Sequence, residues 1–192
     1  MKKKIKVGFD LDGVILYNPL RFLRPIAKSV KFLKPVLFKQ KKDPFYFPKS
    51  NWEKQIWSLL HKTSFRLNDG FYDIQDLIKK QMIEAHIITG RYGMLESDFK
   101  KWLAIIDPKK LFKSTFSNKA NLQPNIFKAN VIKKLKLDFY VEDNWDIVEK
   151  LDHHTDAKIL WITNFLDQRI NYPYKFNNLK GIKKHLAHYL EN

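Results

Sequence analysis

The sequence contains no cysteine among its 192 residues. That absence excludes disulfides, thiolate metal sites and cysteine nucleophiles. It also has no apolar run of membrane-spanning length. The first residues, Met1 and three lysines, resemble the start of a signal peptide, but Asp10 and Asp12 interrupt the apolar segment that should follow. We therefore expect a cytoplasmic protein without a transmembrane segment.

Acidic residues are scarce, with 20 Asp and Glu against 36 Lys and Arg, so the formal net charge is +16. Such a balance favours polyanions or anionic surfaces as partners. A coding bias toward Lys, Asn, Ile and Phe is the alternative explanation, and composition leaves both open. Hydrophobic residues reach 44%. The length suits one domain, or one domain with a modest insertion.

Two aspartates stand at the end of the first predicted strand. The segment 5–9 is short and rich in apolar residues, which indicates a buried strand. Asp10, Asp12 and Gly13 follow this strand. Residues i and i+2 of an extended segment share a face, so the two carboxylates lie close together. They repel each other unless a cation lies between them or one is protonated, and Mg²⁺ suits such oxygen ligands. Two solvated acids at a strand end are the alternative.

Residues 15–67 are basic, aromatic and interrupted by proline, with no clear strand. An apolar stripe from Leu23 to Leu37 predicts one short helix and a broken continuation, because Pro35 should stop or kink the helix. Ser50 and Glu53 match a capping box before a second helix. Between Tyr17 and Leu67, twelve Lys or Arg stand against two acids. We therefore expect a positively charged helical insertion that attracts anionic substrates.

Helices and strands alternate from residue 68 onward, with further strands predicted at 85–88, 111–116, 139–141 and 159–162. This alternation predicts a parallel sheet with right-handed crossovers. The predicted fold is α/β, a three-layer Rossmann-like sheet with strand order 5-4-1-2-3. Residues 1–14 and 68–192 would form the core, and residues 15–67 a helical cap inserted after the first strand.

Polar side chains end three of these strands. Thr89 and Gly90 follow the second strand, Glu142 and Asp143 follow the fourth, and Lys128 opens the helix before the fourth. Strand ends of this kind share one edge of a doubly wound sheet, so these residues meet the paired aspartates there. Carboxylates, a hydroxyl, an amide and a lysine suit phosphoryl transfer through an aspartyl-phosphate.

Four segments resemble the motifs of haloacid dehalogenase (HAD) superfamily phosphatases, in the same order: residues 9–14, residues 88–91, Lys128 and residues 141–144. The stretch 87–144 is most similar to the 5'-nucleotidase branch, which includes 5'(3')-deoxyribonucleotidases. The resemblance implies a C1-type cap that closes over the site and selects the leaving group. It also implies Mg²⁺ as cofactor and a small phosphorylated substrate.

The resemblance implies a role for each matched residue. Asp10 would be the nucleophile. Asp12 would be the general acid and then the general base, and its backbone carbonyl would bind Mg²⁺. Thr89 and the amide of Gly90 would hold phosphoryl oxygens, and Lys128 would neutralise the nucleophile and the phosphoryl group.

Three assignments, those of Glu142, the catalytic lysine and Arg91, have alternatives. Asp143 would bind Mg²⁺, with Glu142 as its acidic neighbour, directly or through water. Asp146 could take the place of Glu142, and Lys119 that of the catalytic lysine. Arg91 is either a substrate contact or a solvated turn residue.

The sequence therefore predicts a Mg²⁺-dependent phosphomonoesterase that acts through an aspartyl-phosphate on a nucleotide or another small phosphate monoester. The alternatives are a basic nucleic-acid or membrane-surface binding protein on a phosphatase scaffold, and a phosphatase of nucleic-acid ends or lipid phosphates. The leaving group and the oligomeric state are not fixed by the sequence.

Overall fold

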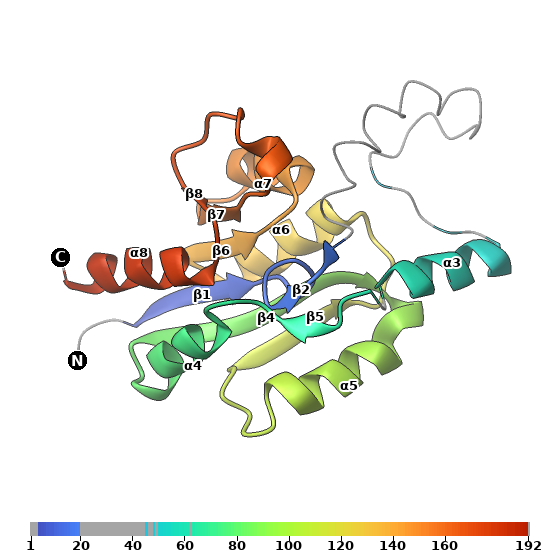
Figure 1. Ribbon diagram of the computed structural model, residues 1–192, viewed down its shortest axis with the longest axis horizontal. Helices are drawn as coiled ribbons and strands as arrows, with labels where there is room; N and C mark the ends of the chain where they lie inside the picture. Colours follow the sequence, from blue (N-terminus) through green and yellow to red (C-terminus); the bar gives the residue numbers. More distant parts are fainter. Residues whose placement is uncertain (1–3, 20–44, 46–47, 49, 62, 192) are drawn as a thin grey trace.

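A computed structural model describes residues 4–19, 45, 48, 50–61 and 63–191, and a six-stranded parallel sheet forms its centre (Figure 1). The sheet has the order β5-β4-β1-β6-β7-β8. Its strands are β1 (Ile5–Phe9), β4 (Ile83–Tyr92), β5 (Ser114–Asn118), β6 (Phe139–Glu142), β7 (Lys158–Ile162) and β8 (Lys175–Phe176). The five predicted strands lie side by side in the predicted order 5-4-1-2-3, so the predicted strand order is confirmed. The edge strand β8 was missed because its two residues are too few to show any periodicity.

Helices cover both faces of this sheet (Figure 1). One face carries α4 (Phe71–Lys79), α5 (Glu96–Ile106) and α8 (Leu179–Glu191), and the other carries α6 (Pro124–Leu135) and α7 (Trp145–His154). Alternate strand residues point into opposite layers. Val141 packs into the core between the sheet and helices α4, α5 and α8. Tyr140 and Trp161 pack into the core between the sheet and helices α6 and α7. Two short 3-10 helices, η3 (Gly93–Leu95) and η4 (Phe165–Asp167), lie in connections. The three-layer prediction is confirmed.

Two element boundaries near the strand ends differ from the prediction. Strand β4 continues to Tyr92, so Thr89, Gly90 and Arg91 belong to the strand, and its pairing with β5 shifts register between Thr89 and Tyr92. Helix α6 begins at Pro124, which suits a first helical position. Lys128 therefore lies one turn inside the helix instead of at its start.

The start of β5 also differs from the expected strand at 111–116. The backbone N–H groups of Leu111 and Phe112 donate to the side chain of Asp107, at 2.6 and 3.2 Å. This turn holds residues 111–112 outside the sheet, and pairing begins at Ser114.

The insertion joins the core through two short strands. β2 (Leu16–Tyr17) pairs antiparallel with β3 (Arg66–Leu67). Helix α3 (Asn51–His61) precedes β3, and the capping box at its start is confirmed by the Ser50 N–H donating to Glu53 Oε2 at 2.8 Å. The helix predicted along residues 23–37 lies outside the described residues, as do ten of the twelve basic residues counted in the insertion.

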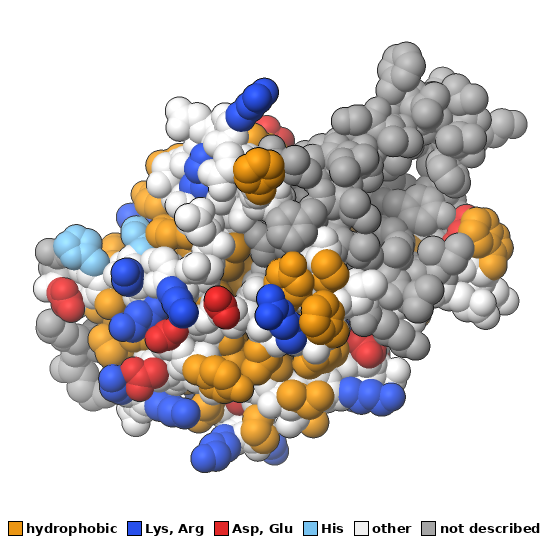
Figure 2. All heavy atoms as spheres, in the orientation of Figure 1, with side chains coloured by type: hydrophobic (Ala, Val, Ile, Leu, Met, Phe, Trp, Pro, Cys, Tyr) orange, Lys and Arg blue, Asp and Glu red, His pale blue; other side chains and the backbone are white. Residues whose placement is uncertain are grey.

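The described helices include none that is both long and apolar enough to cross a membrane. On the face that Figure 2 presents, Lys and Arg side chains are scattered over the described part of the chain among apolar and acidic ones. On that face, the described residues therefore do not gather the basic charge into one patch.

Candidate active site

The loop after β1 brings its aspartates beside β6. The N–H of Asp10 donates to the carbonyl of Val141 at 3.0 Å, which fixes Asp10 next to the end of β6. Gly13 turns the chain with φ of +84°, and a Cβ at this position would lie 2.1 Å from Asp143 Oδ2. Only glycine allows both the turn and the presence of the Asp143 carboxylate there.

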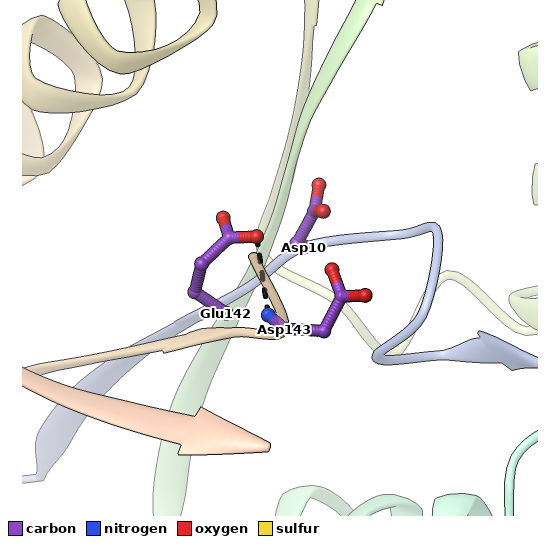
Figure 3. Close-up of side chains that lie close together, drawn as sticks. All are labelled: Asp10, Glu142 and Asp143. Carbon is purple, nitrogen blue, oxygen red and sulfur yellow. Dashed lines mark hydrogen bonds between the residues drawn. The ribbon is translucent and has the colours of Figure 1, made fainter. Parts of the chain in front are cut away.

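Asp10, Glu142 and Asp143 form a group that we call the acidic trio (Figure 3). Each offers a carboxylate oxygen, and these oxygens lie within 4.8 Å of one another. All three residues are buried. The structure thus brings together the two acidic segments predicted from the sequence, at the carboxyl edge of the sheet.

Among the described residues, the lysine that reaches the trio is Lys128. Its Nζ lies 3.1 Å from Asp10 Oδ1 and 2.7 Å from Glu142 Oε2, and the residue is buried. Burial alone would lower the pKa of Lys128, but Asp10 and Glu142 outweigh it and raise this pKa, so the ammonium stays charged. A Cβ on Gly90 would lie 3.5 Å from Lys128 Cε, so the lysine stem passes beside Gly90. Lys119, the alternative, is exposed and pairs with Glu96 at 3.0 Å.

Glu142 is engaged within the protein at both oxygens. Oε2 accepts from Lys128, and Oε1 accepts from the backbone N–H groups of Asp143 at 3.1 Å and Asn144 at 3.0 Å. The Asn144 side chain in turn caps α7 by accepting from the N–H of Asp146. Glu142 therefore orients both the lysine and the loop that carries Asp143. Asp146, the alternative to Glu142, is not a member of the acidic trio.

The electrostatics of the trio fit a divalent cation. The pKa of Asp10 is raised to about 8. Burial is the largest cause, Lys128 opposes it, and the charges of Glu142, Asp143 and Asp12 add to the rise. Among the described residues, three buried carboxylates gather here, and the Lys128 ammonium pairs with two of them, Asp10 and Glu142. A hard cation such as Mg²⁺ takes carboxylate oxygens as ligands and would relieve this repulsion.

Arg91 binds Asp12 from the neighbouring strand. Its Nε donates to Asp12 Oδ2 and its Nη2 to Asp12 Oδ1, both at 2.7 Å, and its Nη1 pairs with Asp98 at the start of α5. Arg91 is 2% exposed, so the interpretation as a solvated turn residue is wrong. We call this group, Arg91 with Asp12 and Asp98, the arginine bridge. Asp98 was not expected at the site, because nothing in its local sequence marks it.

Two hydroxyl groups complete the surroundings of the bridge. Ser64 Oγ donates to Asp12 Oδ1 at 2.7 Å, and Ser64 is buried. Thr89 is buried as well, and its Oγ1 accepts from the N–H of Arg91 at 3.3 Å. Ser64 was missed from the sequence because it lies 52 residues from Asp12 and in no motif.

No protein-family model and no curated protein matches this chain, but solved structures do. A HAD-superfamily hydrolase from Ehrlichia chaffeensis is 17% identical, with all of both chains covered and a TM-score of 0.56. A protein from Bacillus subtilis described as a HAD-hydrolase bound to magnesium is 16% identical, with all of both chains covered and a TM-score of 0.61. CbbY from Rhodobacter sphaeroides, in complex with phosphate, is 11% identical over 92% of this chain and 95% of that one, with a TM-score of 0.58. This chain therefore has the Rossmann-like fold of the HAD-superfamily hydrolases.

Proposed function

We propose that this protein is a Mg²⁺-dependent phosphomonoesterase of the HAD superfamily that acts through an aspartyl-phosphate at Asp10. One observation carries the proposal: the Asp10 carboxylate is buried at the carboxyl edge of the sheet, 3.1 Å from Lys128 Nζ and within the acidic trio. The shared fold supports hydrolase chemistry, and two of the similar proteins hold magnesium or phosphate.

The reaction begins with attack of an Asp10 oxygen on phosphorus. As that O–P bond forms, the bond from phosphorus to the leaving oxygen breaks, and Asp12 gives the leaving oxygen a proton. A water molecule then attacks the phosphorus of the aspartyl-phosphate and loses a proton to Asp12. Phosphate leaves, and the carboxylate of Asp10 is restored.

The remaining groups hold the phosphoryl oxygens in place. Lys128 neutralises negative charge on Asp10 and on the transferred group, while Thr89 and the Gly90 amide donate hydrogen bonds. Mg²⁺, when bound, screens the repulsion between carboxylate and phosphate. Asp10, Asp143 and the Asp12 carbonyl would hold it. Glu142 affects the ion indirectly and is not a direct ligand, because both its oxygens already bind groups of the protein.

The substrate in this proposal is a nucleotide or another small phosphate monoester. The similarity of residues 87–144 to the 5'-nucleotidase branch supports a nucleotide. The alternatives that involve nucleic acids, lipid phosphates or membrane surfaces rest on the basic insertion. They stay predictions, because ten of its twelve basic residues lie outside the described part of the chain.

A phosphate-release screen tests the proposal. Purified protein is incubated with 5'- and 3'-nucleotides, sugar phosphates and an aryl phosphate, with Mg²⁺ or with EDTA. We expect release that requires Mg²⁺ and is strongest for one substrate class. Absence of release from every ester in the presence of Mg²⁺ would contradict the proposal.

A further inference from the structure

Ser64 occupies a distinctive place between the insertion and the catalytic loop. It follows α3 of the insertion and precedes β3, which pairs with β2. Two segments join the insertion to the core, one containing β2 and Asn18 and the other containing Thr63, Ser64 and β3, and we call them its arms. Thr63 Oγ1 donates to Asn18 Oδ1 at 3.3 Å, so the two arms are bonded to each other beside Ser64. The insertion is attached to the sheet through these arms, and Ser64 belongs to one of them.

The hydroxyl of Ser64 is directed at Asp12 and not at the solvent. Ser64 is 2% exposed and its Oγ lies 2.7 Å from Asp12 Oδ1, the same oxygen that accepts from Arg91 Nη2. Arg91 is itself braced by Asp98, which fixes the guanidinium. The Asp12 carboxylate is thus held from two directions, by a rigid strand residue and by a residue of the insertion's arm.

Arg91 and Ser64 differ in the hydrogen bonds that they can make with Asp12. A guanidinium can only donate hydrogen bonds, whereas a hydroxyl both donates and accepts. Ser64 can therefore stay bonded to Asp12 before and after Asp12 transfers a proton. We propose that Ser64 is a positioning residue: it aligns Asp12 for proton transfer and makes that alignment depend on the arm that carries the insertion. This inference rests on the proposed function.

The dependence of kcat/KM on the leaving group tests the inference. kcat/KM covers the steps up to departure of the leaving group, and an alkyl phosphate needs a proton there far more than an activated aryl phosphate such as 4-nitrophenyl phosphate. We expect Ser64→Ala to lower kcat/KM about tenfold for an alkyl phosphate and by no more than about twofold for 4-nitrophenyl phosphate. Ser64→Thr, which keeps the hydroxyl, should restore the wild-type ratio of the two values.

Thr63→Val is the matched control, because it removes a hydroxyl of the same arm that bonds Asn18 instead of Asp12. It should leave the ratio of the two kcat/KM values as in wild type. If Ser64→Ala does not fold, Ser64→Cys keeps the size of the side chain with only a weak donor. Ser64→Cys should also lower kcat/KM more for the alkyl phosphate than for 4-nitrophenyl phosphate.

An active wild type in which Ser64→Ala, or Ser64→Cys in its place, lowers both values equally would overturn the inference and leave the proposed function standing. If the variant keeps both kcat/KM values at their wild-type level, the inference would likewise be overturned and the proposed function would stand. A wild type without activity on any ester would overturn the proposed function, and the inference with it.

Discussion

The two charged groups of the site, the acidic trio and the arginine bridge, balance their charge differently. In the trio, the Lys128 ammonium pairs with Asp10 and Glu142, and Asp143 adds a third buried carboxylate. In the bridge, the carboxylates of Asp12 and Asp98 share the guanidinium of Arg91, and Asp12 receives two bonds from Arg91 and one from Ser64. The trio places three buried carboxylates at the carboxyl edge of the sheet, a set that suits a cation. The bridge holds the Asp12 carboxylate in place, and in the proposed mechanism this carboxylate transfers the proton.

Removing the nucleophile breaks the trio at its centre. Asp10→Asn should lower Mg²⁺-dependent phosphate release about 10⁴-fold or more, because an amide cannot form an acyl phosphate. Circular dichroism should confirm a folded variant. Wild-type-like turnover would remove Asp10 from the mechanism.

Breaking the bridge should cost stability. Arg91→Met leaves Asp12 and Asp98 without their shared cation, and Asp12 is almost fully buried. We expect the free energy of unfolding to fall by about 3 kcal/mol in denaturant titrations. Adding Asp98→Asn removes one uncompensated charge and should recover part of this loss. A free energy of unfolding equal to that of wild type would show that the bridge contributes nothing.

Substitutions of different members of the trio should weaken Mg²⁺ binding to different extents. Asp143→Ala should raise the Mg²⁺ concentration for half-maximal activity about 100-fold, because it removes a direct ligand. Glu142→Gln, which acts through Lys128 and the loop, should raise it about tenfold. Equal effects in the two titrations would place both residues in direct contact with the ion.

The pH dependence of stability sharpens the comparison further. Without a cation, the pKa of Asp10 is raised from 3.8 to about 8. Its neutral form therefore supports the fold at low pH, and that support is lost as the pH rises from about 4 to about 8. In EDTA, the melting temperature of Asp10→Asn should exceed that of wild type by about 5 °C more at pH 8 than at pH 5. A pH-independent difference in thermal scans would contradict the raised pKa.

The sequence was sufficient for the sheet order and for most of the acidic trio, because strand ends carry short local motifs there. Residues 9–14 and 141–144 follow buried strands, and parallel strands place such ends together. The arginine bridge was not predictable, because Arg91 and Asp12 lie 79 residues apart and meet only through the register of β1 and β4. Ser64 was hidden for the same reason. The full length of β4 was hidden because polar residues within it resemble a strand end.

The central claim is that Asp10 carries the phosphoryl group during turnover. Wild-type protein is mixed with its best substrate and Mg²⁺, quenched in acid within one turnover, digested and analysed by mass spectrometry. We predict a phosphoryl group on the peptide that contains Asp10, released by hydroxylamine and absent from Asp10→Asn. Phosphate release by an enzyme whose quenched peptides carry no phosphoryl group at Asp10, or carry it at another residue, would contradict the claim.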